Sequence, residues 1–159
     1  MADSENNQLA AELTKDLLTQ LAPQEKALFR SISESYFKDP EKTLADQRAR
    51  DEMLGFGAAE TITLLTPILL SVSDDVIRFL FAEAQKAMQS ESSSLISETV
   101  KSWFGRFRQD ADKKSPPPLT PEQLEQVRKI AVKKAQQLKL SEKNTKMLAD
   151  AIVGSLAIH

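Results

Sequence analysis

The chain has 159 residues, a formal net charge of −2, one histidine and no cysteine. Without cysteine it has no disulfide, no thiolate metal site and no cysteine nucleophile, and it suits a reducing compartment. The histidine is the last residue, His159, so histidine-based triads and metal clusters are not expected. Glycine is scarce, and no sustained alternation of apolar and polar residues predicts a strand. We therefore predict an all-α fold, a helical bundle of about six to eight helices.

The first part of the chain shows helix signals in close succession. Leucines recur every four residues over 8–21 and predict an amphipathic helix. Pro23 suits the first turn of a second helix, over 23–37. Asp39, followed by a proline and a glutamate, is predicted to cap the start of a further helix.

Residues 54–84 are the most apolar part of the sequence. Between Glu60 and Asp74 lie 13 uncharged residues, whereas a membrane-spanning helix needs about 20. Because charged residues flank this run, insertion is costly, and we predict a buried core helix. In the alternative, residues 58–72 and 76–88 form an apolar hairpin that a partner or low pH releases towards a membrane.

Three residues of this stretch are predicted as hinge positions. Gly55 and Gly57 indicate a bend or a close approach of another backbone. Pro67 indicates a kink or a new helix start, so the helix either breaks between residues 66 and 73 or runs unbroken from about 67 to 89.

A helix is predicted over residues 95–108, and its last part is the most suggestive binding stretch. It combines aromatic and basic side chains, which are common anchors of protein interfaces and also suit a membrane surface. In the alternative, Trp103 and Phe107 pack inwards and the cations are solvated. The predicted interaction surface consists of Lys101, Trp103, Phe104, Arg106, Phe107 and Arg108.

The sequence divides into three parts. A helical bundle is predicted over 1–108, and the charged, proline-rich segment 109–118 is predicted to be an extended linker. Residues 119–159 then form a helical hairpin. Because so short a hairpin buries little surface alone, we expect it to dock on the bundle or on a partner chain.

The helix starts of this hairpin are unusually well specified. Thr120 and Gln123 have the spacing of a capping box, with Pro121 at the first helical position. Ser141 is predicted to cap the second helix. The residues predicted to face inwards are Leu124, Val127, Ala131, Ala135 and Leu138, then Met147, Leu148, Ala151, Ile152, Ser155 and Leu156.

Charge is distributed unevenly along the chain. Residues 1–60 carry 7 basic and 12 acidic side chains, and residues 101–146 carry 12 basic and 5 acidic ones. Either the two ends attract each other, within one fold or across a dimer, or the basic part meets an acidic partner, an anionic membrane or nucleic acid.

The function is predicted mainly by exclusion. The sequence lacks a glycine-rich phosphate loop, a dinucleotide fingerprint and an EF-hand loop, and its adjacent acidic pairs point about 100° apart on a helix. We predict no catalytic residue, cofactor, metal or small-molecule substrate. No signal peptide is visible, and we expect a soluble, cytoplasmic adaptor or regulatory module that binds a protein partner or self-associates. A membrane-active or lipid-binding effector is the alternative, and nucleic-acid binding through the basic hairpin ranks third.

Overall fold

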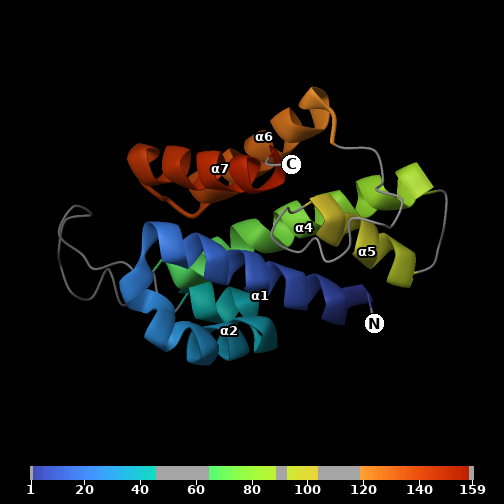
Figure 1. Ribbon diagram of the computed structural model, residues 1–159. Coiled ribbons are helices and arrows are strands. Elements are labelled where there is room, and N and C mark those ends of the chain that lie inside the picture. Colours follow the sequence, from blue (N-terminus) through green and yellow to red (C-terminus); the bar gives the residue numbers. More distant parts are fainter. Residues whose placement is uncertain (1, 46–64, 89–92, 104–118, 158–159) are drawn as a thin grey trace.

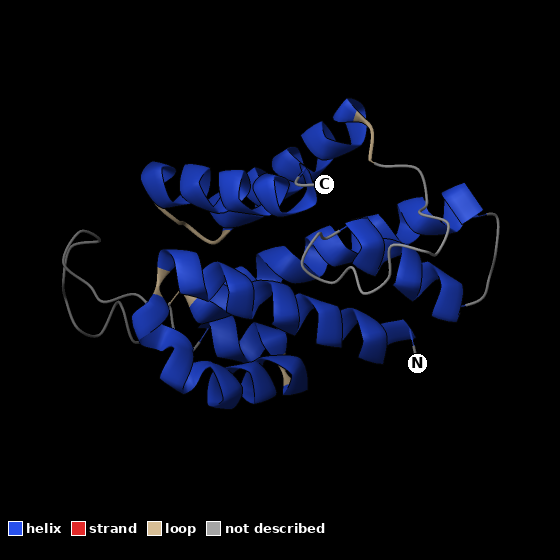
Figure 2. Cartoon of the chain, viewed as in Figure 1, coloured by secondary structure: helices blue, strands red, loops and turns tan. Residues whose placement is uncertain are grey.

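The computed structural model describes residues 2–45, 65–88, 93–103 and 119–157. Helices make up nearly all of these residues and no strand occurs among them, which confirms the predicted all-α helical bundle (Figure 2). In chain order the elements are α1 (Ala2–Leu21), the 3₁₀ helix η1 (Pro23–Leu28), α2 (Phe29–Lys38), α4 (Thr66–Met88), α5 (Ser93–Trp103), α6 (Pro121–Gln137) and α7 (Glu142–Ala157).

Helix α4 lies at the centre of the molecule. It packs against α1, α2, α5 and α6, and α7 packs against α6 and α1. Figure 1 shows α6 and α7 on one side of α1 and α4, with α2 on the opposite side. A single hydrophobic cluster contains buried residues of α1, α4, α5, α6 and α7, so the C-terminal hairpin shares its core with the rest of the described chain. The predicted linker, 109–118, lies outside the described residues.

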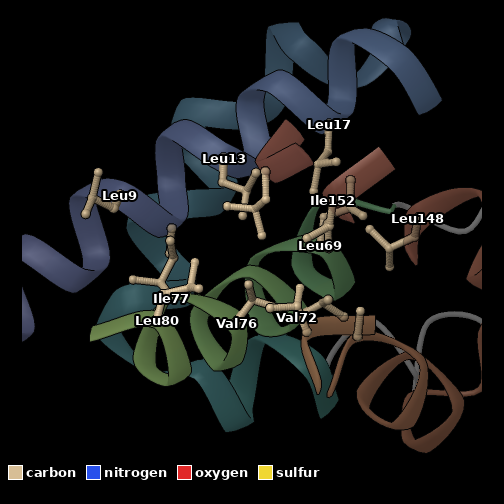
Figure 3. Packing of buried hydrophobic residues seen from close by; sticks show 14 of the residues in the cluster. Leu9, Leu13, Leu17, Leu69, Val72, Val76, Ile77, Leu80, Leu148 and Ile152 are labelled. Carbon is tan, nitrogen blue, oxygen red and sulfur yellow. The ribbon is translucent and has the colours of Figure 1, made fainter. Parts of the chain in front are cut away.

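The described part of the apolar stretch, residues 65–84, contributes the centre of the core, as its pattern predicts. Side chains of α1, α4 and α7 point towards one another at the centre (Figure 3). Burying one such aliphatic side chain contributes about 1.5–3 kcal/mol. Within the described residues, no helix has both the length and the apolar character that crossing a bilayer requires. The large apolar side chains of α4 that are fully buried are Leu69, Leu70, Val72, Val76, Ile77 and Leu80.

Proline 67 begins α4 rather than interrupting it. The helix runs unbroken from Thr66 to Met88, so the interpretation with one continuous helix is confirmed and the break between 66 and 73 is wrong. At the first turn a proline removes no intrahelical hydrogen bond, because the amides there have no partner within the helix. Asp74 and Asp75 consequently lie in the middle of a helix, not at the tip of a hairpin.

The start of α4 is held by a buried carboxylate from another element. Glu25 of η1 is 5% exposed. Its Oε2 accepts a hydrogen bond from the Leu65 amide at 2.9 Å, and its Oε1 accepts from the Thr66 amide at 2.9 Å and from the Thr66 hydroxyl at 2.7 Å. The carboxylate satisfies amides at the positive end of the helix dipole. No local pattern around Thr66 indicates this cap, since its partner is 41 residues away.

The helix predicted over 23–37 is wrong in its first half. Residues Pro23–Leu28 form the 3₁₀ helix η1, and α2 begins at Phe29. Tight turns of this kind are frequent at helix ends. The predicted cap after α2 is confirmed, because the amide of Lys42 donates to Asp39 Oδ1 at 3.2 Å and residues 40–45 are helical.

The hairpin has the predicted helix starts. Thr120 Oγ1 accepts from the Gln123 amide at 3.1 Å, and the Thr120 amide donates to Gln123 Oε1 at 2.9 Å, which completes the capping box. Ser141 Oγ accepts from the amide of Asn144 at 3.2 Å. One inward prediction is wrong, because Met147 is 42% exposed. The buried stripe of α7 instead follows Thr145, Leu148, Ala149, Ile152 and Leu156, which turns Met147 away from the core.

Candidate functional site

The predicted interaction surface on α5 falls partly in the core. Lys101 is exposed, but Trp103 is 3% exposed and belongs to the hydrophobic cluster. The indole ring is therefore not part of the outer face of α5. The other predicted members, Phe104, Arg106, Phe107 and Arg108, lie outside the described residues.

The predicted hinge positions give no site within the described chain. Pro67 is buried in the first turn of α4, where the helix is continuous. Gly55 and Gly57 lie outside the described residues.

Asp74 is a half-buried carboxyl group in the middle of α4. Burial raises its pKa above the usual range, and the charge of Asp75 adds to the rise, while Arg78 opposes it. Asp74 Oδ2 accepts from Arg78 Nε at 3.1 Å, whereas the buried Oδ1 has no hydrogen-bond partner. An unpartnered carboxylate oxygen disfavours the ionised form, which is the physical cause of the shift.

A buried tyrosine lies near this carboxylate. Tyr36 of α2 is 4% exposed, and burial raises the pKa of its phenol. A side-chain hydrogen bond with Ser71 opposes this rise, while the charges of Asp74 and Asp75 reinforce it.

The two neighbouring aspartates of α4 face different surroundings. The buried Oδ1 of Asp74 belongs to the interior, while Asp75 Oδ2 lies 3.7 Å from Lys134 Nζ of α6. Neighbouring positions on a helix point about 100° apart, which accounts for the different surroundings of the two carboxylates. No group of three His, Cys, Asp or Glu side chains in the described part of the chain is arranged to hold a metal ion.

The outer face of the hairpin carries a group of lysines that we call the basic surface. All of them are exposed, and none makes an ion pair with a described residue. The neighbouring cations of the same hairpin are paired, with Arg128 Nη1 2.7 Å from Asp150 Oδ1 and Lys134 close to Asp75. The basic surface consists of Lys129, Lys133, Lys139, Lys143 and Lys146.

This surface occupies the half of the hairpin nearest the turn. Residues 129–147 contain six lysines and a single acidic residue, Glu142. Lys143 lies in the first turn of α7, where the helix dipole favours acidic side chains. Helix stability therefore does not account for this lysine.

The turn itself places a lysine in a strained backbone conformation. Lys139 has a φ of 63°, in the left-handed region that favours glycine. It follows α6 in a Schellman arrangement, in which the amide of Leu140 bonds to the Ala135 carbonyl and that of Lys139 to the Gln136 carbonyl, both at 3.0 Å. A glycine would make the same turn at lower cost, so this lysine also opposes stability.

One ion pair between described residues joins the hairpin to the rest of the molecule. It links Lys134 of α6 to Asp75 of α4 and involves none of the five lysines of the basic surface. The basic surface thus remains exposed on the folded chain.

The basic character of the hairpin is visible in its sequence, but two of its features are not. The exposure of Met147 was missed because apolar periodicity alone placed this residue inwards. The strain at Lys139 has no sequence signal, since the turn has no glycine. The chain matches no family model, and no curated protein or solved structure is significantly similar to it.

Proposed function

We propose that this protein is a non-enzymatic interaction module of the adaptor or regulatory type, which docks a negatively charged protein partner on its basic surface. The observation that supports the proposal is the group of exposed lysines on α6, the turn and α7, which have no ion-pair partner among the described residues. An exposed, uncompensated cluster of one charge steers and selects an oppositely charged partner.

Some lysines of this cluster lower the stability of the fold, which supports a role other than folding. Lys139 occupies a left-handed position, and Lys143 lies at the unfavourable end of a helix dipole. Residues that oppose stability are typical of functional surfaces. The burial of α4 leaves its apolar side chains engaged within the protein, so no observation of comparable weight favours the membrane-active alternative.

Cross-linking in cells of the source organism tests the proposal. Tagged wild type is compared with two variants that change charge equally, and cross-linked proteins are quantified by mass spectrometry. The control lysines are exposed and outside the hairpin. The surface variant is Lys133→Glu, Lys139→Glu and Lys143→Glu, and the control variant is Lys15→Glu, Lys26→Glu and Lys42→Glu.

We expect a defined set of partners to be retained by the control variant and lost by the surface variant. Thermal unfolding of the purified proteins verifies that both variants fold. A partner set that is the same for all three proteins, or the absence of any enriched protein, would overturn the proposal.

A further inference from the structure

We infer that the basic surface recognises an acidic protein segment in which carboxylates surround one large apolar side chain, and that Met147 receives this side chain. The inference rests on the proposed function and goes beyond it by naming the chemistry of the partner. It combines two independent observations, the unpaired lysines and an exposed apolar residue among them.

Met147 shares a face of α7 with Lys143. It is four residues after this lysine, and residues four apart on a helix are neighbours, about 5–6 Å apart. Met147 is 42% exposed, whereas the apolar residues Leu148 and Ile152 of the same helix are fully buried. Methionine is flexible and polarisable, and it is frequent at binding surfaces that accept apolar side chains.

The surroundings of this methionine favour a protein over a bilayer. The exposed apolar residue is a single methionine, 42% exposed. Interfacial helices instead insert several large apolar residues into the bilayer.

The composition of the surface also disfavours nucleic acid. It has no aromatic side chain for base stacking, and the one arginine of the hairpin, Arg128, is paired with Asp150. Lysine ammonium groups on flexible stems suit a segment whose carboxylates are not rigidly spaced.

Fluorescence anisotropy with defined probes tests the inference on the full chain. The first probe is a short labelled peptide of glutamates around a central phenylalanine, and the second has alanine in place of the phenylalanine. A short DNA duplex and vesicles of phosphatidylcholine and phosphatidylserine, in a ~4:1 ratio, represent the other anionic partners. The variants are the surface variant, the control variant and Met147→Gln.

We expect the phenylalanine peptide to bind wild type about tenfold more tightly than the alanine peptide, because the ring packs on Met147. Met147→Gln should reduce this ratio towards one without abolishing binding. The surface variant should weaken both peptides by about tenfold or more, and the control variant should weaken neither. Added salt should weaken both peptides for the wild type.

Three results would overturn the inference: binding of vesicles or DNA with neither peptide bound, a phenylalanine-to-alanine ratio that Met147→Gln leaves unchanged, or no binding of any probe. If cross-linked partners still depend on the basic surface in any of these cases, the proposed function survives and only the chemistry assigned to the partner is wrong. If the cross-linking also shows no such dependence, both fail.

Discussion

Helix α4 and the α6–α7 hairpin are stabilised in different ways. In the first part of α4, from 66 to 73, every side chain is buried, and the start of that helix is held by a carboxylate from η1. The hairpin helices bury one face each and begin with caps from their own sequence, Thr120 and Ser141. The central helix thus depends on its neighbours for both packing and termination, whereas the hairpin helices specify their own starts.

The difference extends to what each region has available for function. Polar groups inside the core are largely partnered, as in the 3.1 Å hydrogen bond between the hydroxyls of Thr14 and Ser73. On the hairpin, Met147 and five lysines with no ion-pair partner among the described residues remain exposed. The buried core around α4 stabilises the fold, and the proposed binding surface lies on the outer face of the hairpin.

The largest expected effect comes from opening the core. Leu80 is fully buried on α4, and we expect Leu80→Ala to lower the free energy of unfolding by about 2–5 kcal/mol because it leaves a cavity. Urea unfolding followed by circular dichroism measures this loss. The matched change on the exposed hairpin face, Met147→Ala, should alter the free energy of unfolding by no more than ~0.5 kcal/mol. Equal losses in the two variants would refute the contrast between the regions.

The two kinds of helix cap can be compared directly. Glu25→Ala leaves the amides of Leu65 and Thr66 buried without a partner, and we expect a loss of about 2–3 kcal/mol in the free energy of unfolding. Thr120→Ala removes an exposed local cap, so we expect a loss of about 1 kcal/mol.

Chemical denaturation of both variants ranks the caps. Glu25→Gln should lie between wild type and Glu25→Ala, because its amide retains one acceptor oxygen. If Thr120→Ala proves the more damaging change, the start of α4 does not depend on η1 as we describe.

The turn of the hairpin should show a conflict between stability and binding. Lys139→Gly relieves the left-handed strain, and we expect it to raise the free energy of unfolding by about 1 kcal/mol. It also removes one lysine of the basic surface, so acidic-peptide binding should weaken. Lys139→Ala is the control, since it removes the same charge but keeps a Cβ at the strained position. A glycine variant no more stable than the alanine variant would contradict the strain argument.

The smallest expected effect is a pH dependence of the stability that comes from Asp74. Because burial raises the pKa of Asp74, the folded state holds its proton at pH values where the unfolded chain has released it. The contribution of Asp74 to the free energy of unfolding is thus greatest at pH values below the pKa of the unfolded chain's carboxyl group. This contribution falls as the pH rises through the raised pKa of the folded state. We expect Asp74→Asn to be more stable than wild type at neutral pH, with the difference shrinking as the pH is lowered.

Urea titrations at neutral and mildly acidic pH measure this difference, and Asp75→Asn serves as a control with the same change of charge. The groups around Asp74 are Asp75 and Arg78 on α4, Tyr36 on α2 and Lys134 on α6. If the stability difference between Asp74→Asn and wild type stays constant or grows on acidification, the pKa of Asp74 is not raised in the folded state. The expected sign also opposes the idea that low pH releases α4, because protonation of Asp74 favours the folded state.

Much of the fold was predictable because its signals are local. The capping box at Thr120, the cap at Ser141 and the cap at Asp39 each involve residues within three positions of one another. The apolar run of α4 was recognised as core because it is too short and too flanked by charge to span a bilayer. The basic character of the hairpin was likewise visible in its composition.

The errors arose where the deciding contact is distant in the sequence. A helix was expected from Pro23 onwards, but its first turns form a 3₁₀ helix from which Glu25 reaches the start of α4. Met147 was expected inside because its own periodicity fits, yet the packing of α7 on α6 and α1 sets which stripe is buried. For Trp103 the sequence allows both a surface position and a core position, and packing within the hydrophobic cluster places it in the core.

The sequence by itself determined that this protein is helical, where most of its helices begin and which stretch forms the core, because hydrophobic periodicity and caps act over a few residues. Only the tertiary structure decided that α4 is continuous and anchored by Glu25. It also left five lysines of the hairpin exposed, with no ion-pair partner among the described residues. Those outcomes depend on contacts between segments that are far apart in the sequence. Local sequence patterns do not show which of these segments meet in space.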